Sequence, residues 1–195
     1  MKKSLLQFAV LVGTCFGFVN SAFAGEGCVI AGPANAPITI EEYADFECVY
    51  CAKGAEAMKK VLQDYQGKVK LVLRNMPLSA HPHAASAAKA FVAVWLQNPS
   101  VAYNFQETLF TNQSRLQNEG EEFLIEAAKS LGVDIDRMKT DMQGDEVQKI
   151  LAEDAALAKG YGFRGTPSFR IGSESVLGSR PYSEIKTIID RQMNP

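Results

Sequence analysis

The sequence predicts an α/β fold that is interrupted by a block of helices. Between residues 38 and 74 an alternating strand runs directly into a helix and then a second strand. Roughly residues 82–160 show one helical pattern after another, and the chain ends with two short strands and a helix. A strand–helix–strand unit of this length forms a parallel crossover. We therefore expect the order β-α-β, helical block, β-β-α, with all strands in one sheet.

The first 24 residues have the pattern of a secretory signal peptide. Lys2 and Lys3 precede an apolar core over residues 5–19, and Ala22-Phe23-Ala24 fits the small-x-small cleavage pattern. The alternative is a retained membrane anchor, but the core is short and interrupted by glycine. We therefore expect residues 1–24 to be removed and the protein to reach the periplasm.

Composition excludes several classes of function. The net charge is −2 and no cluster of Lys or Arg is present, which excludes a nucleic-acid partner. The longest apolar run after the signal, residues 90–96, is far too short to span a bilayer. Residues 25–37, rich in Gly, Ala and Pro, predict an arm without regular structure that is too short for a dimerisation domain. We expect a soluble monomer.

The first strand, Ile38–Ala44, places an acid among apolar side chains. Alternation puts Glu42 on the same face as Ile38 and Ile40. If this face is buried, desolvation raises the pKa of Glu42, and its carboxyl group could exchange a proton with a nearby thiol. The alternative is an edge strand with a solvated Glu42.

A Cys-x-x-C sequence follows this strand at the start of a helix expected from Cys48 to about Tyr65. Cys48 at the N-cap faces unpaired backbone N–H groups and the positive end of the helix dipole, which favour its thiolate. Cys48 is therefore the better nucleophile and Cys51 the better resolving thiol. A bare Cys-x-x-C is also typical of half a zinc site or of a structural disulfide.

The other cysteine and histidine residues leave alternatives open. With Cys48 and Cys51, the two histidines His81 and His83 could bind zinc or copper, or His81-Pro82-His83 could instead open a helix. With Cys28, the number of cysteines after the signal peptide is odd, which favours a chemical role for the Cys-x-x-C pair. Cys28 itself, near a flexible N-terminus, is an incidental free thiol, a third redox participant or an intermolecular bridge.

The remaining elements follow in order. Val69–Arg74 alternates as a second strand that Pro77 ends. Helices are expected over residues 84–96, 101–111, 121–131, 135–142 and 145–159. A glycine-rich loop then leads into a short strand ending at Ile171, a hairpin partner over 174–177 and a closing helix from Pro181. The predicted domains are 38–80 with 161–195, and a helical insertion over 81–160.

Four segments in this order resemble the DsbA-like branch of the thioredoxin superfamily: residues 45–51, 74–83, 165–167 and 178–182. The resemblance covers nearly the whole chain after the signal peptide and implies a thioredoxin fold with an inserted helical domain. It also implies a cis peptide bond at Thr166-Pro167 and a loop that binds an extended substrate.

The same resemblance implies roles for individual residues. Cys48 resembles the exposed nucleophile, Cys51 the buried resolving thiol and Glu42 the buried acid. Between the cysteines stand Val49 and Tyr50, where strong oxidants of the family commonly have proline and then an aromatic residue or histidine. Tyr50 could donate a hydrogen bond to the Cys48 thiolate, whereas Val49 lacks the preset φ of proline.

The expected function is therefore that of an exported thiol–disulfide oxidoreductase without a cofactor. It would donate the Cys48–Cys51 disulfide to reduced secreted proteins through a mixed disulfide at Cys48, and a membrane partner would reoxidise the pair. One alternative is a disulfide isomerase or reductase of the same family. Another is a periplasmic metal-binding protein that uses the two cysteines with His81 and His83.

Overall fold

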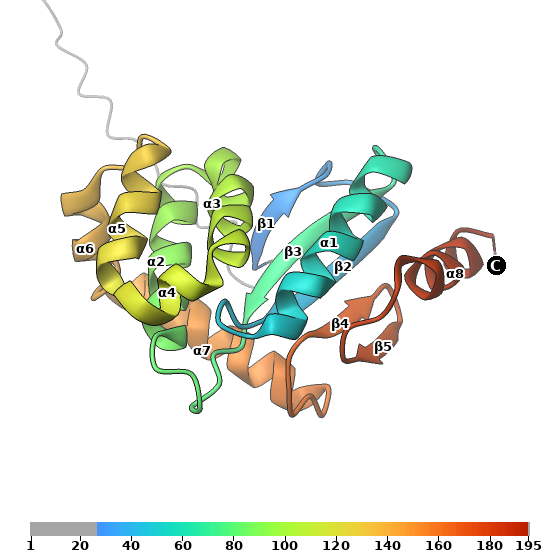
Figure 1. Ribbon diagram of the computed structural model, residues 1–195. Helices are drawn as coiled ribbons and strands as arrows, with labels where there is room; N and C mark the ends of the chain where they lie inside the picture. The colour runs from blue at the N-terminus through green and yellow to red at the C-terminus, as the bar shows by residue number, and fades with distance from the viewer. Residues whose placement is uncertain (1–26, 195) are drawn as a thin grey trace, which may run out of the picture.

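The computed structural model describes residues 27–194, which form a five-stranded mixed sheet with helices around it (Figure 1). The strand order is β1-β3-β2-β4-β5. The strands are β1 (Cys28–Ala31), β2 (Ile38–Ala44), β3 (Val69–Asn75), β4 (Ser168–Ile171) and β5 (Glu174–Leu177). β2 and β3 are parallel, as predicted, and the other pairs are antiparallel. The predicted signal peptide lies outside the described residues.

The helices separate into two groups (Figure 1). They are α1 (Val49–Asp64), α2 (Ala84–Gln97), α3 (Pro99–Thr111), α4 (Gln113–Glu119), α5 (Glu121–Ser130), α6 (Ile135–Asp141), α7 (Asp145–Gly160) and α8 (Tyr182–Met193). α1 and α8 pack against each other beside the sheet, whereas α2 to α6 gather at its β1 side. α3 contacts both β1 and α1, and α7 contacts β3, so the inserted helices are joined to the sheet. This is a thioredoxin fold with a helical insertion. Within residues 27–194 no helix is long and apolar enough to cross a membrane.

The prediction of an irregular N-terminal arm was wrong for residues 28–31. They form β1, which pairs antiparallel with β3 and places Cys28 opposite Leu73. A strand of four residues beside glycine and proline has too little alternation to be detected, but the open edge of β3 supplies backbone partners. Cys28 is fully buried rather than near a flexible end, and burial raises its pKa well above that of an ordinary thiol. A buried thiol of this kind is a poor nucleophile.

The sequence also failed to predict α4. This helix has only two turns and its one buried side chain is Leu116, so it shows no amphipathic pattern of its own. Elsewhere in the insertion the predicted helices are present, with ends that differ by a few residues. Their apolar sides form the part of the core that contains Phe91, Phe105 and Leu124.

Candidate functional site

The site begins where β2 ends. Residues 45–48, here called the redox turn, join β2 to α1, and Cys48 is the N-cap residue of α1 with extended backbone angles. The Cys51 N–H donates to the Cys48 carbonyl at 2.9 Å, which closes the first turn of the helix. The predicted placement of the two cysteines is confirmed. Cys51 is fully buried, and Cys48, which the resemblance implied to be exposed, is also buried, with only 7% of the residue accessible.

The two thiols have opposite acidities. A hydrogen bond from the Cys51 thiol lowers the pKa of Cys48 to about 5, and the backbone N–H groups of Cys51 and Tyr50 act in the same direction. Burial raises the pKa of Cys51 far above that of an ordinary thiol, and its hydrogen bond to Cys48 adds to this effect. At neutral pH the reduced pair therefore holds a thiolate at Cys48 and a proton at Cys51.

Glu42 is buried on the central strand β2, so the alternative of a solvated edge residue is excluded. Its side chain is 0% exposed, and neither carboxyl oxygen has a hydrogen-bond partner among the described residues. Burial raises its pKa to about 8, with a further contribution from the charge of Glu107. A Cβ added to Gly54 of α1 would lie 3.4 Å from both Glu42 Oε1 and Pro167 Cγ, so Glu42 and the Pro167 loop both lie beside Gly54.

The loop before β4 faces the cysteines. The Thr166-Pro167 peptide bond is cis, as the family resemblance implied, and the Thr166 carbonyl lies 3.5 Å from Cys48 Sγ. Tyr50 is placed differently from the prediction. Its side chain is 58% exposed, and no hydrogen bond joins its hydroxyl group to Cys48 in the described chain. The backbone N–H of Tyr50, rather than its hydroxyl group, contributes to the low pKa of Cys48.

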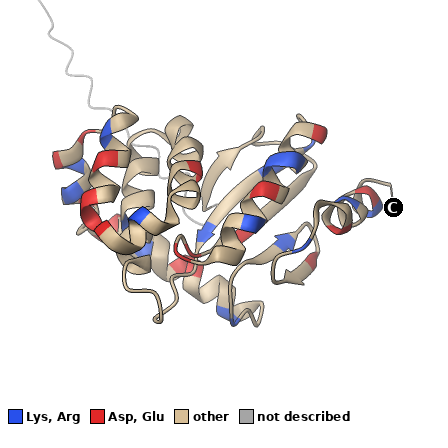
Figure 2. Cartoon of the chain, viewed as in Figure 1, with Lys and Arg blue, Asp and Glu red and all other residues tan. Residues whose placement is uncertain are grey.

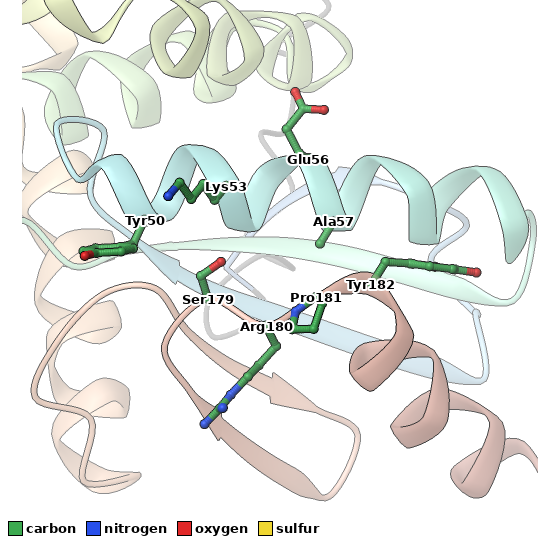
Figure 3. A pocket seen from close by; sticks show the side chains of 8 residues that line it. All are labelled: Tyr50, Lys53, Glu56, Ala57, Ser179, Arg180, Pro181 and Tyr182. Carbon is green, nitrogen blue, oxygen red and sulfur yellow. The ribbon is translucent and has the colours of Figure 1, made fainter.

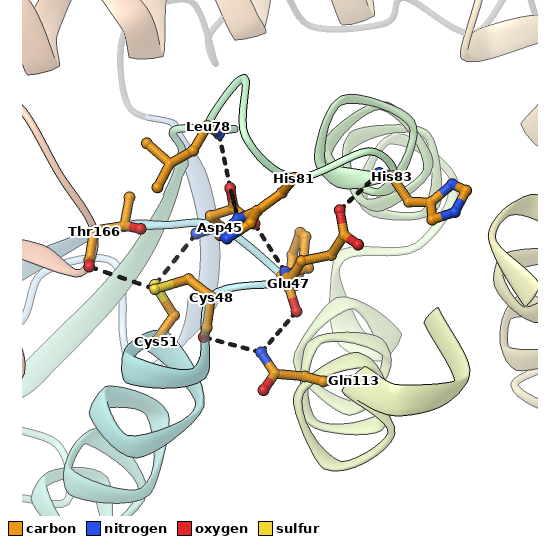
Figure 4. Close-up of polar contacts among 10 residues, drawn as sticks. Asp45, Glu47, Cys48, Cys51, Leu78, His81, His83, Gln113 and Thr166 are labelled. Carbon is orange, nitrogen blue, oxygen red and sulfur yellow. Dashed lines mark hydrogen bonds and ion pairs between the residues drawn. The ribbon is translucent and has the colours of Figure 1, made fainter. Parts of the chain in front are cut away.

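No sequence pattern predicted the network of polar contacts that joins the redox turn to the helical insertion and to the segment before α2 (Figure 4). The buried carboxylate of Asp45 accepts hydrogen bonds from the backbone N–H groups of Glu47 at 2.8 Å and Leu78 at 2.7 Å. It also contacts His81 Nδ1 at 2.9 Å, which raises the pKa of His81. The Asp45 N–H donates to Cys51 Sγ at 3.4 Å, so this acid connects the segment before α2 to the resolving thiol.

Two further contacts join the helical insertion to the same turn. Glu47 Oε2 accepts a hydrogen bond from the His83 N–H at 2.7 Å. The side-chain amide of Gln113, the first residue of α4, donates to the carbonyls of Phe46 and Cys48, both at 2.9 Å. No local pattern marks Gln113, because its partners lie 67 and 65 residues away in the chain.

The two histidines make contacts at the start of α2. His83 directly precedes α2, which confirms that His81-Pro82-His83 opens a helix. His81 is paired with Asp45, and His83 packs against Gly120. Within residues 27–194 no group of three or more His, Cys, Asp or Glu side chains is placed to hold a metal ion. The predicted alternative, a metal site of Cys48, Cys51, His81 and His83, therefore has no geometric support.

A pocket of about 530 Å³ opens beside the N-terminal half of α1 (Figure 3). It lies between α1 and the segment that leads into α8, and its lining includes Tyr50, Lys53, Arg180 and Tyr182. Tyr50 lies two residues after Cys48 in the first turn of α1, so one end of the pocket is formed by the turn that follows the redox cysteine.

Comparisons with known proteins agree with this geometry. A family model described as thioredoxin matches residues 25–191. The probable disulfide bond formation protein D of Bacillus cereus is 24% identical over 89% of this chain and 82% of its own length. The crystal structure of oxidised BdbD from Bacillus subtilis superposes with a TM-score of 0.78 at 24% identity, covering 89% of this chain and 96% of that one. A thioredoxin-like oxidoreductase from Silicibacter pomeroyi superposes with a TM-score of 0.73 at 28% identity, covering 85% and 91%.

Another relative is much longer than this chain. The Na(+)/H(+) antiporter NhaA of Herminiimonas arsenicoxydans is 30% identical over 83% of this chain, but the chain spans only 25% of the antiporter's length. The thioredoxin match, in contrast, extends over almost all of the described residues. The chain belongs to the thioredoxin family.

Proposed function

We propose that this protein is an exported oxidase that donates the Cys48–Cys51 disulfide to reduced secreted proteins. The observation that carries the proposal is the contrast between the two thiols: the pKa of Cys48 is lowered to about 5, whereas that of Cys51 is raised. A low pKa makes Cys48 a good leaving group and stabilises the reduced pair. Each pKa unit corresponds to about 1.4 kcal/mol, or about 30 mV for a two-electron couple.

The proposed reaction has two exchange steps. A substrate thiolate attacks Cys48 Sγ, the Cys48–Cys51 bond breaks, and Cys51 leaves as a thiolate that takes up a proton. Glu42, buried with a pKa raised to about 8, supplies that proton. A second substrate thiolate then attacks the substrate sulfur of the mixed disulfide. Cys48 leaves as a thiolate, the substrate keeps the new disulfide, and two electrons remain on the pair.

Substrate binding is proposed for the loop that faces the sulfur. The backbone of Thr166 would pair with an extended substrate segment, next to the cis bond at Pro167. The pocket beside Tyr50 would take a neighbouring part of the substrate, or of the membrane partner that reoxidises the pair. The relatives named disulfide bond formation protein D support this reading.

Equilibration of the pair with glutathione tests the direction of the reaction. We expect a potential nearer to the roughly −120 mV of DsbA than to the roughly −270 mV of thioredoxin. Cys48→Ser should abolish oxidation of reduced ribonuclease, and Cys51→Ser, treated with oxidised glutathione, should accumulate a mixed disulfide of Cys48 with glutathione as reduced glutathione is released. A potential near that of thioredoxin would contradict the oxidase proposal. Efficient reactivation of scrambled ribonuclease with slow oxidation of the reduced enzyme would indicate an isomerase instead.

A further inference from the structure

The contact between Gln113 and the redox turn is unusual because one side-chain amide donates to two backbone carbonyls. Both acceptors, the oxygens of Phe46 and Cys48, lie 2.9 Å from Gln113 Nε2. The opposite orientation of the amide would set its oxygen against two carbonyl oxygens, so this assignment is the consistent one. Gln113 is half-buried, and Figure 4 shows it reaching the turn from the insertion.

Packing around Phe46 holds Gln113 in this position. The centroid of the Phe46 ring lies 5.2 Å from the ring centroid of Phe110 in α3 and 5.4 Å from that of Phe91 in α2. Gln113 follows Phe110 by three residues, after the short break between α3 and α4. The aromatic contacts therefore fix the distance from the start of α4 to the turn, and the amide spans it.

The two carbonyls matter because they belong to the turn that carries the Cys48 sulfur. A carbonyl oxygen carries a partial negative charge, and that of Cys48 belongs to the same residue as the thiolate. The Cys48 carbonyl also accepts from the N–H groups of Cys51 and Ala52, so its orientation determines how the first turn of α1 presents its N–H groups to the sulfur. A further donor offsets the negative charge and holds the peptide units in place.

We propose that Gln113 is a positioning residue of the redox pair. By donating to the Phe46 and Cys48 carbonyls, it holds the redox turn in the arrangement that favours the thiolate of Cys48. The helical insertion, which contributes none of the reacting atoms, thereby makes the pair more oxidising. This inference rests on the proposed function, because its effect is on the potential of the Cys48–Cys51 couple.

Gln113→Met tests the inference, since methionine has a similar length and is a good helix former but has no donor. The titration of the Cys48 thiolate, followed by its absorbance at 240 nm, should shift upward by roughly half a pKa unit. The equilibrium constant with glutathione should change about threefold towards the disulfide form. Gln113→Asn keeps the amide group but is shorter by one methylene, so we expect a smaller shift in the same direction.

Gln97→Met is the matched control. The Gln97 amide also bonds to backbone groups of the insertion, donating to the Asp134 carbonyl at 3.0 Å and accepting from its N–H at 3.1 Å, but it makes no contact with the redox turn. It should lower the melting temperature about as much as Gln113→Met and leave the Cys48 titration unchanged. If Gln113→Met lowers only the melting temperature, Gln113 is a structural contact and the inference fails. If wild-type Cys48 titrates like an ordinary thiol, the proposed function fails instead.

Discussion

The two sides of the redox turn each carry a buried acid, and these acids have opposite surroundings. On the sheet side, Glu42 is fully buried and its oxygens have no hydrogen-bond partner among the described residues. On the insertion side, Asp45 is just as buried but has two backbone donors and a histidine around its carboxylate. Burial by itself therefore does not identify a proton-exchanging acid. Burial, with no hydrogen bond to offset it, raises the pKa of Glu42, whereas the hydrogen-bond partners of Asp45 join it to the segment before α2.

The variant Glu42→Gln should show the largest effect of this contrast. It is studied in the disulfide form so that no active-site thiol titrates. The pKa of Glu42 is raised from 4.5 to about 8 in the folded protein, so the folded state binds the extra proton between these values. Wild-type stability should therefore fall as the pH rises from about 5 to 9, by roughly 4 kcal/mol relative to the variant. Denaturant unfolding at several pH values measures this difference.

Glu56→Gln, on the exposed surface of α1, is the matched control and should keep the pH dependence of the wild type, because it retains Glu42. The variant Glu42→Gln should also slow disulfide exchange by about tenfold if Glu42 supplies the proton for Cys51. A pH dependence that survives in Glu42→Gln would assign the titration to another group.

Asp45→Asn should have the next largest effect, on stability rather than on acidity. Asparagine keeps one acceptor oxygen, but its NH₂ group replaces the other. That NH₂ donor would face a backbone N–H that, in the wild type, donates to a carboxylate oxygen at 2.7 to 2.8 Å. We expect a loss of about 2 kcal/mol in the free energy of unfolding at pH 7. Asp136→Asn on the surface of α6 should cost no more than about 0.5 kcal/mol. Equal losses in the two variants would show that the Asp45 contacts contribute little.

His81→Gln should have the smallest effect, and the size of that effect depends on pH. The contact with Asp45 raises the pKa of His81 in the folded state. The ion pair therefore stabilises the wild type fully below the pKa of the unfolded chain, about 6.5, and this contribution is lost as the pH rises through the raised folded value. The wild type should exceed the variant by about 1 kcal/mol at pH 5 and by less at pH 9. A difference that grows with pH would contradict the ion pair.

Local patterns in the sequence were sufficient to predict the reactive half of the site. Alternation along residues 38–44 placed Glu42 on the face of Ile38 and Ile40, which the structure buries, and the following Cys-x-x-C spacing placed Cys48 at the helix start and Cys51 one turn further. These features depend only on the periods of strand and helix, which are properties of neighbouring residues. The family resemblance added the cis bond at Thr166-Pro167.

Only the tertiary structure determined what holds the redox turn. The β1 strand forms because the edge of β3 is open to it, and the two turns of α4 have a single buried side chain, Leu116. The partners of Asp45 in the 78–81 segment lie 33 and 36 residues away, and those of Gln113 still further. Such pairs depend on how the insertion packs on the sheet, which no local pattern encodes. The sequence by itself therefore identified the two thiols and Glu42, and the packing of the insertion determined the polar contacts around the redox turn.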